Sequence, residues 1–252
     1  MERYQDKVVL ITGAGDVAEA AAKRLLCEGA KVAFSDFSQE ALDAAISGLK
    51  AEGWDGERLM GIKCDVRKYE ECEAAANAVL ARWGQIDTLV ATAGIIRHCP
   101  IDEMTEAQWQ DVVDINLTGV FASIQSVFTN MKEHSYGRIV VVSSVAAQVG
   151  GGLLGTSVYA ASKGGVNSLI KAVAKEGGPY NVACCGVCPA YTKTAITAGM
   201  DQDRHNRILS QIPLGRPADP QEIANLILFY ASDLASFVTG EIGNADGGLR
   251  MD

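Results

Sequence analysis

The sequence lacks the features that mark membrane, secreted and nucleic-acid-binding proteins. No apolar run approaches the roughly 18 residues that a membrane helix needs. No cluster of Lys and Arg is present and the formal net charge is −9, so a phosphate-backbone partner is not expected. Residues 1–7 lead straight into an apolar run, which leaves no room for a signal peptide. We therefore expect a cytoplasmic protein with no membrane or nucleic-acid partner.

The cysteines show no pattern typical of disulfides or metal sites. There are seven, an odd number at irregular spacing, which argues against a disulfide framework. Cys184, Cys185 and Cys188 lie close together, but no second Cys or His pair at metal spacing accompanies them. Free cysteine in an apolar strand behaves as a small hydrophobic residue. We therefore expect these cysteines in the core and predict no metal site.

Short apolar runs alternate with helical patterns along the whole chain. The predicted strands are residues 7–12, 31–35, 59–64, 86–92, 138–143, 182–187 and 237–243. The predicted helices are residues 17–28, 38–52, 67–83, 105–133, 157–176 and 220–231, with residues 190–218 irregular. This alternation predicts an α/β fold in which helices cover both faces of a doubly wound parallel sheet of about seven strands. No linker or repeat interrupts it, so residues 1–252 are predicted to form a single domain.

A glycine-containing turn follows the first predicted strand. Gly13 and Gly15 there would let the backbone approach a pyrophosphate at a helix N-terminus. Two further glycines would complete the usual pattern, but the chain continues with Asp16 and Val17. Asp16 is predicted to be the helix N-cap, with Glu19 completing a capping box. These carboxylates would repel a pyrophosphate and compete for the same N–H groups, which favours weak cofactor binding.

Acidic residues end the second and third predicted strands. Asp36 lies about 20 residues beyond the glycines, where a carboxylate can bind the adenosine ribose and repel a 2′-phosphate. Phe37 follows at a position where a phosphate-binding enzyme would need Arg or Lys. A helix N-cap is the alternative role for Asp36, although Ser38 is better placed for it. Asp65 could contact the adenine or be an ordinary turn residue. The pattern favours NAD over NADP.

Tyr159 and Lys163 are four residues apart in a predicted helix, so they share one face of it. A neighbouring ammonium lowers the pKa of a phenol, which makes tyrosine usable as a general acid or base. Ser144, after the fifth strand, could bind the same substrate oxygen. Asn116 is unfavourable inside a helix, and holding a water in a proton path behind Lys163 would explain it. Taken alone, a Tyr-x-x-x-Lys pair is commonplace and usually belongs to a solvated helix face.

In order and spacing, these motifs resemble the short-chain dehydrogenase/reductase family over nearly the whole chain. The matching segments are Thr12-Gly13-Ala14-Gly15, Cys64-Asp65-Val66, Ala93-Gly94, Asn116-Leu117-x-Gly119, Ser143-Ser144, Tyr159-x-x-Ser162-Lys163, Pro189, Gly240 and Asp246-Gly247-Gly248. The resemblance implies a Rossmann-like fold, a nicotinamide dinucleotide and a catalytic tetrad. In that tetrad Tyr159 is the general acid/base, and Lys163 lowers its pKa and binds the nicotinamide ribose. Ser144 orients the substrate oxygen and Asn116 supports the proton relay.

The resemblance also implies a set of cofactor-binding residues. These are Gly13, Gly15, Asp16, Val17, Asp36, Phe37, Asp65, Val66, Ala93, Gly94, Tyr159, Lys163, Pro189, Thr192 and Thr194. Three departures from the family pattern stand out. The glycine loop is one residue short, which weakens the expected pyrophosphate site. Thr92 replaces an asparagine, which predicts the loss of a polar contact between strands, and Ala190 replaces the glycine that usually follows Pro189.

The leading hypothesis is an NAD-dependent oxidoreductase that transfers a hydride between nicotinamide and a secondary alcohol or ketone. Polyols, sugars, hydroxysteroids, hydroxy acids and 3-oxoacyl compounds remain open as substrates. Residues 145–157 and 190–212 are expected to select among them, and Arg97 and His98 either face the pocket or are solvated. The family implies a homotetramer, or a homodimer, built on the helices that carry Asn116 and Tyr159. The alternative is a weakly or non-catalytic scaffold on the same fold, because of the altered glycine loop.

Overall fold

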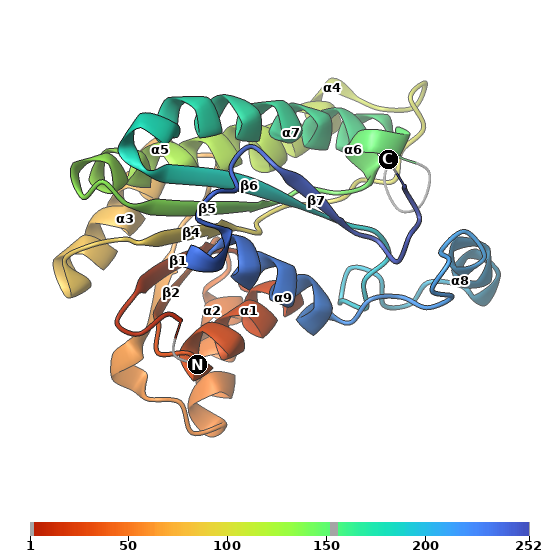
Figure 1. Cartoon of the computed structure of the whole chain (residues 1–252). Helices are drawn as coiled ribbons and strands as arrows, with labels where there is room; N and C mark the ends of the chain where they lie inside the picture. The colour runs from red at the N-terminus through yellow and green to blue at the C-terminus, as the bar shows by residue number, and fades with distance from the viewer. Residues whose placement is uncertain (1–2, 152–155, 252) are drawn as a thin grey trace.

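The computed structural model describes residues 3–151 and 156–251, which form one seven-stranded parallel sheet in the order β3-β2-β1-β4-β5-β6-β7 (Figure 1). The strands are β1 (Val8–Thr12), β2 (Lys31–Asp36), β3 (Leu59–Lys63), β4 (Thr88–Ala91), β5 (Gly137–Val142), β6 (Val182–Pro189) and β7 (Ile242–Ala245). Every neighbouring pair is parallel. The predicted Rossmann-like, doubly wound sheet is confirmed.

Helices cover both faces of this sheet (Figure 1). One layer is α3 (Tyr69–Trp83), α5 (Gly119–Glu133) and α7 (Ser157–Gly177), and the other is α1 (Asp16–Cys27), α2 (Gln39–Ala51) and α9 (Pro220–Tyr230). Successive strand residues point to opposite faces, so Val9 and Ile11 pack in one core and Val8 and Leu10 in the other. A strand covered on both faces must be apolar throughout, which explains the uninterrupted apolar runs.

The long helix predicted over 105–133 contains a π-helical turn. It consists of α4 (Glu106–Val113), the turn η2 (Asp114–Thr118) and α5, and Thr105 begins it with a capping box. Single π turns inside α-helices are frequent at functional sites. By length and composition alone, Glu106–Glu133 could cross a membrane, which differs from the prediction that no segment could. In the fold, 44% of its most apolar window is buried.

The last strand and the segment before α9 differ in part from the sequence prediction. β7 begins at Ile242 rather than at 237, because Phe237 and Val238 lie in a turn closed by the Val238 N–H donating to the Ala235 carbonyl. Residues 190–218 are irregular, as predicted, around the short helix α8 (Gln202–Leu209). A further helix, α6 (Ala146–Val149), lies within the segment expected to bind substrate.

Cys184, Cys185 and Cys188 are buried in β6, so their predicted core position is confirmed.

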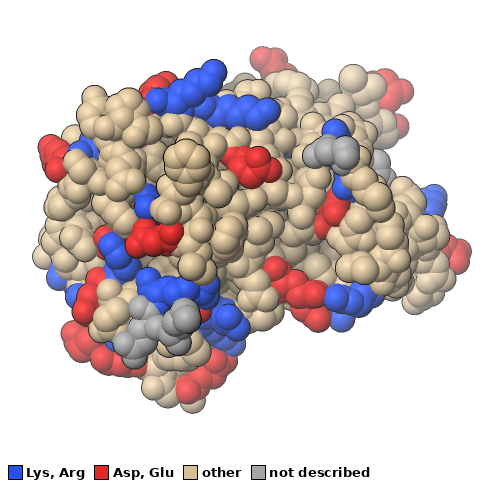
Figure 2. All heavy atoms as spheres, viewed as in Figure 1, with Lys and Arg blue, Asp and Glu red and all other residues tan. Residues whose placement is uncertain are grey.

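The surface carries charges of both signs. Figure 2 shows Lys and Arg interspersed with Asp and Glu on one face, and the described residues there form no continuous basic stripe.

Candidate active site

Two adjoining hollows lie at the carboxyl ends of the strands, the edge at which open α/β sheets bind ligands. The larger is a cleft of about 600 Å³ that reaches from the ends of β2 and β3 to α7. The smaller, of about 120 Å³, lies beyond Tyr159 and is lined by residues that follow β5 and β6. Six residues line both hollows: Ile96, Val142, Ser143, Tyr159, Thr194 and Ile196. Tyr159 therefore stands at the junction of a long cleft and a small pocket.

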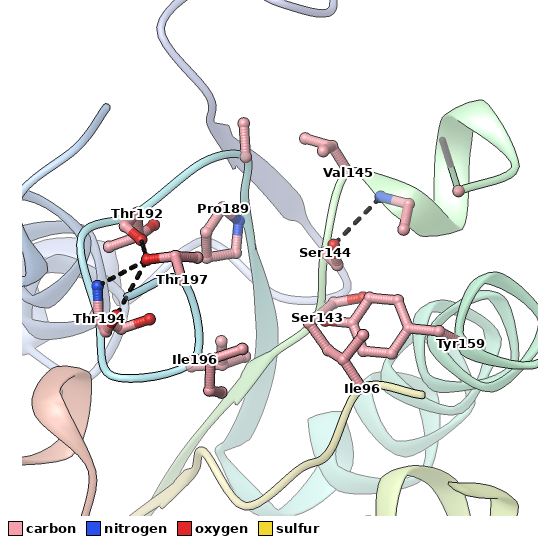
Figure 3. Close-up of a pocket in the computed structure, with 14 residues that line it drawn as sticks. Ile96, Ser143, Ser144, Val145, Tyr159, Pro189, Thr192, Thr194, Ile196 and Thr197 are labelled. Atoms are coloured by element: carbon pink, nitrogen blue, oxygen red, sulfur yellow. Dashed lines mark hydrogen bonds between the residues drawn. The ribbon is translucent and has the colours of Figure 1, made fainter. Parts of the chain in front are cut away.

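The predicted catalytic residues meet at this junction. Tyr159 and Lys163 lie on the first turns of α7 and both line the larger cleft, while Ser144 and Tyr159 line the smaller pocket. In Figure 3, Ser144 and Tyr159 lie on one side of that pocket and Thr194 on the other. Ser144 lies two residues beyond the end of β5, and its hydroxyl oxygen accepts from the Ala146 N–H at 3.1 Å. This short turn fixes the hydroxyl beside the tyrosine.

Asn116 is fully buried in the π-helical turn and holds two elements of the site together. Its Oδ1 accepts from the Ile95 N–H at 2.8 Å, and its Nδ2 donates to the Ile95 carbonyl at 2.9 Å and to Ser162 Oγ at 3.3 Å. A Cβ on Gly94 would lie 3.2 Å from Asn116 Oδ1 and 3.6 Å from Lys163 Nζ. Asn116 thus adjoins Lys163, as the sequence predicts. Its contact with a water remains a prediction, which would use the second lone pair of Oδ1.

Burial dominates the electrostatics of the tyrosine and the lysine. It raises the pKa of Tyr159 above its usual value of 10, against a smaller lowering by a hydrogen bond with Ser144. It lowers the pKa of Lys163 to about 8, because this residue is 3% exposed and its ammonium is poorly solvated. The pKa of Tyr159 is thus raised on balance, and the lowering by Lys163 expected from the sequence stays a prediction. The Lys163 Nζ lies over the Tyr159 ring, 5.9 Å from its centre, and donates to the Val142 carbonyl at 2.8 Å.

The structure brings together every residue predicted to bind the cofactor. The larger cleft is lined by Gly13, Gly15, Asp16, Val17, Asp36, Phe37, Asp65, Val66, Ala93, Gly94, Tyr159, Lys163 and Thr194. Pro189 and Thr192 line the smaller pocket. Ile95 and Ile96 also line the cleft although no sequence motif singled them out, whereas Ile196 belongs to the segment 190–212 expected to bind substrate. The position of Ile95 and Ile96 within two residues of Gly94 was the available indication.

The glycine loop has one position that requires glycine and one that leaves room for a ligand. Gly13 has a φ of +90°, and a Cβ there would lie 2.9 Å from Thr92 Oγ1. Gly15 is extended, and a Cβ there would meet nothing within 4 Å. Open space in front of a helix N-terminus, where N–H groups lack partners in the helix, suits a phosphate.

Asp16 does not play the role predicted for it. Gly15 is the N-cap of α1, no side chain caps this helix, and Asp16 is its first residue. The Asp16 carboxylate instead accepts a hydrogen bond from the Ala195 N–H at 2.8 Å. The predicted capping box is wrong, because the carboxylate has a partner in the segment after β6 that a local pattern does not include.

Asp36 ties the glycine loop to β2. Its Oδ2 accepts from the Ala14 N–H at 2.9 Å, and its Oδ1 accepts from the Ser38 N–H at 2.7 Å. Ser38 itself is the N-cap of α2, so Asp36 does not have the alternative role of N-cap. Each carboxylate oxygen keeps a second lone pair for a hydroxyl group. Beside it Phe37 is 66% exposed in the wall of the cleft.

Asp65 and Thr92 make protein contacts of their own. Asp65 pairs with Arg67 at 2.7 Å, and this hydrogen-bonded guanidinium lowers the pKa of the carboxyl group. A contact between Asp65 and an adenine stays a prediction. Thr92 Oγ1 donates to the Thr12 carbonyl at 2.6 Å, so the predicted loss of a polar contact between β4 and β1 is wrong. A hydroxyl makes the contact in place of an amide.

The rim of the larger cleft and the two segments expected to bind substrate, residues 145–157 and 190–212, match the prediction only in part. Arg97 is exposed and pairs with Asp111 at 2.8 Å on the rim of the larger cleft, and His98 is exposed. Gly151 and Ala190 line the smaller pocket, whereas Gly152 and Gly155 lie outside the described residues. Gln148 is not among the residues that line it.

The residues present fit a nicotinamide dinucleotide. Besides the open space at Gly15, the Thr192 hydroxyl is buried, lines the smaller pocket and has no hydrogen-bond partner within residues 3–151 and 156–251. Buried polar groups are nearly always paired, so an orphaned hydroxyl in a pocket indicates a ligand contact. Asp36, Lys163 and Thr192 thus offer polar groups along the length that such a molecule spans.

Comparison with known proteins gives matches along nearly the whole chain. A family model described as enoyl-(acyl carrier protein) reductase matches residues 13–250. The 3-oxoacyl-[acyl-carrier-protein] reductase of Thermotoga maritima is 38% identical over 248 residues, which cover 98% of this chain and 99% of that protein. The trans-4-hydroxycyclohexanecarboxylate dehydrogenase of Sinomonas cyclohexanicum is 37% identical over 261 residues, covering 100% of this chain and 98% of that protein.

A solved structure shows the same architecture. It is a short-chain dehydrogenase/reductase from Brucella melitensis, described as a glucose/ribitol dehydrogenase. Its TM-score is 0.90 at 31% sequence identity, and the match covers 99% of both chains. The fold is therefore shared with proteins of this kind.

Proposed function

This chain belongs to the short-chain dehydrogenase/reductase family, and from that premise we propose that it is an NAD-dependent dehydrogenase or reductase of a secondary alcohol or ketone. Its relatives carry the names of reductases and dehydrogenases, so oxidoreduction with a nicotinamide dinucleotide is its class of activity. The observation that carries the proposal is the position of Tyr159, which lines both the dinucleotide-sized cleft and the small pocket. A group at that junction can reach a substrate oxygen beside the cofactor.

The chain's own residues divide the proton chemistry between them. A bound nicotinamide supplies or accepts the hydride. Tyr159 donates the proton that a ketone oxygen needs, or accepts the proton that an alcohol releases. The Ser144 hydroxyl donates a hydrogen bond to the same oxygen and orients it. Lys163, held against the Val142 carbonyl, places a positive charge at the ribose end and replenishes the proton path together with Asn116.

The preference for NAD is supported by Asp36 and Phe37. The Asp36 carboxylate lies beside the Ala14 N–H in the loop that faces the adenosine half. A 2′-phosphate would bring two more negative charges against it, whereas ribose hydroxyls can donate to its free lone pairs. Phe37 offers an exposed aromatic surface and no positive charge.

The small pocket favours an uncharged and largely apolar substrate. Val145, Ala146, Ala190 and Ile196 supply its apolar walls, and no charged side chain occurs among its described lining residues. Within the classes named from the sequence, the lack of a positive charge among the described residues of the pocket disfavours hydroxy acids.

We further propose a cytoplasmic homotetramer, or homodimer, built on the helices that carry Asn116 and Tyr159. Gly164 on α7 supports this arrangement, because a Cβ there would meet nothing within 4 Å and a partner helix could approach closely. Analytical ultracentrifugation distinguishes these states from a monomer.

Tyr159→Phe tests the proposed function. We expect the wild type to turn over at least one member of a panel of secondary alcohols and ketones, with NAD(H) in preference to NADP(H). The phenylalanine variant should lose at least about 10³-fold in kcat and keep its fold and NADH binding, because only the proton carrier is removed. Tyr180→Phe, which alters an exposed tyrosine outside both hollows, is the matched control.

Retained turnover in Tyr159→Phe would overturn the mechanism. Absence of NADH and NADPH binding at millimolar concentration would instead favour the scaffold hypothesis. Preferential binding of NADPH would leave the mechanism standing and overturn the NAD assignment.

A further inference from the structure

One hydrogen bond joins the two walls of the larger cleft. The Asp16 carboxylate, at the first turn of α1, accepts from the Ala195 N–H at 2.8 Å across 179 sequence positions. Asp16 and Ala195 both line the cleft, and the neighbouring Thr194 and Ile196 line the small pocket as well. The contact therefore connects the nucleotide side of the site with the turn that forms a wall of the substrate side.

The turn that Asp16 holds is compact. Thr197 Oγ1 accepts from the Thr194 N–H and donates to the Thr192 carbonyl, at 3.0 and 2.8 Å, and the Ala198 N–H donates to the Thr194 carbonyl. These bonds close residues 194–198 into one unit, which we call the 194–198 turn. Asp16 contacts that unit through the Ala195 backbone N–H. A change at Asp16 can therefore move the turn as a whole.

The carboxylate also carries its charge where a pyrophosphate would bind. The N-terminus of α1 has a positive dipole, and the space in front of Gly15 is open. Asp16 is the first residue of that helix and is exposed. Two negative groups cannot share this place without repulsion, which at a few ångströms in a partly solvated cleft changes affinity by about tenfold. The phosphate must either displace the carboxylate or bind weakly beside it.

We propose that Asp16 is a latch that links dinucleotide binding to the 194–198 turn. Without a dinucleotide, the carboxylate holds the turn through Ala195. A bound pyrophosphate repels the carboxylate, the hydrogen bond to Ala195 breaks, and the turn is released beside the substrate pocket. The latch lowers the affinity for dinucleotide and makes the substrate wall respond to it. This inference rests on the proposed function for the identity of the ligand.

Two substitutions separate the charge of Asp16 from its hydrogen bond. Asp16→Asn removes the charge and keeps an oxygen that can accept from Ala195, whereas Asp16→Ala removes both. Glu19→Gln is the matched control, since Glu19 is a carboxylate on the same helix that is not among the lining residues of the cleft. Isothermal titration with ADP and with adenosine measures affinity with and without a diphosphate. Hydrogen exchange of a peptide that contains Ala195 reports on the turn.

We expect both Asp16 variants to bind ADP about tenfold more tightly than the wild type, with adenosine binding unchanged, because only the diphosphate meets the carboxylate. Exchange at Ala195 should be faster in Asp16→Ala and in the wild type with ADP, and unchanged in Asp16→Asn. Glu19→Gln should change neither measurement by more than about twofold, because the Glu19 carboxylate does not line the cleft.

Unchanged or weaker ADP binding in Asp16→Asn would overturn the proposal, as would identical Ala195 exchange in the wild type with and without ADP. An Asp16 with a purely structural role would weaken ADP and adenosine alike. Neither measurement requires turnover. Tighter ADP binding in a protein that oxidises no alcohol would support the latch and contradict the proposed function, and the reverse pattern would contradict the latch alone.

Discussion

The two ends of the cleft are built in different ways. At the chemical end, Asn116 and Lys163 are almost completely buried, and each donates a hydrogen bond to a backbone carbonyl, of Ile95 and of Val142. At the nucleotide end, Asp16 and Phe37 are exposed. A buried group cannot change without disturbing the core, whereas an exposed loop can change at little cost to stability. The comparison teaches that this chain can keep its proton chemistry while its affinity for the dinucleotide changes.

The largest expected effect is on the chemical end, from Lys163→Met. Methionine fills a similar volume but supplies no charge and no proton, so kcat should fall by about 10³-fold. Lys171→Met, on the exposed side of the same helix, is the control and should keep full activity. Steady-state rates with the alcohol from the screen give the measurement. Equal rates in the two variants would show that the buried end is not the chemical one.

The pH dependence of stability offers a second test of that end. The pKa of Lys163 is about 8 in the fold and 10.5 in an ordinary lysine. Between these values the unfolded chain holds a proton that the folded chain has released. The free energy of unfolding contributed by this group therefore rises as pH increases from about 8 to 10.5. The rise should total roughly 3 kcal/mol at about 1.4 kcal/mol per pH unit.

Urea unfolding of the wild type and of Lys163→Met across this pH range measures that rise as a difference. Other groups titrate alike in both proteins and cancel. The free energy of unfolding of the wild type, relative to that of the variant, should rise as pH increases. Parallel curves would mean that Lys163 is solvated and that burial does not control its charge.

Substitutions in the glycine loop test the nucleotide end of the cleft, and we expect them to have smaller effects than Lys163→Met. Gly13→Ala places a Cβ 2.9 Å from Thr92 Oγ1 at a φ of +90°, which should cost roughly 1–3 kcal/mol of stability. Gly15→Ala should leave stability nearly unchanged, since its Cβ meets nothing within 4 Å, but should weaken NADH binding by filling that space. Thermal unfolding and NADH titration of both variants measure the two effects. Equal destabilisation by both would contradict the difference between the two positions.

What the sequence predicted well depends on local spacing. Tyr159 and Lys163 share a helix face because they are four residues apart, and Ser144 follows a strand whose apolar run is plain in the sequence. The alternation of strands and helices predicts the sheet because parallel strands need crossover connections. These features do not depend on contacts with residues far along the chain.

What the sequence could not predict depends on partners far along the chain. Asp16 looks like a helix cap until its contact with Ala195 is known. The sequence predicts that Thr92 loses a polar contact, and only the pairing of β4 with β1 brings its hydroxyl to the Thr12 carbonyl. The pKa of Tyr159 follows from burial, which a sequence pattern does not measure. Phe237 and Val238 look like a strand, but the turn after α9 delays β7 to Ile242.

The most direct test of the difference between the two ends is the initial rate of NAD reduction as a function of NAD concentration, with the alcohol identified by the screen. An intact chemical end and a weakened nucleotide end predict an ordinary kcat, of about 1 s⁻¹ or more, reached only at a KM for NAD of about 1 mM or higher. A KM in the low micromolar range would contradict the weakened nucleotide end. Binding of NAD without turnover would contradict the intact chemical end.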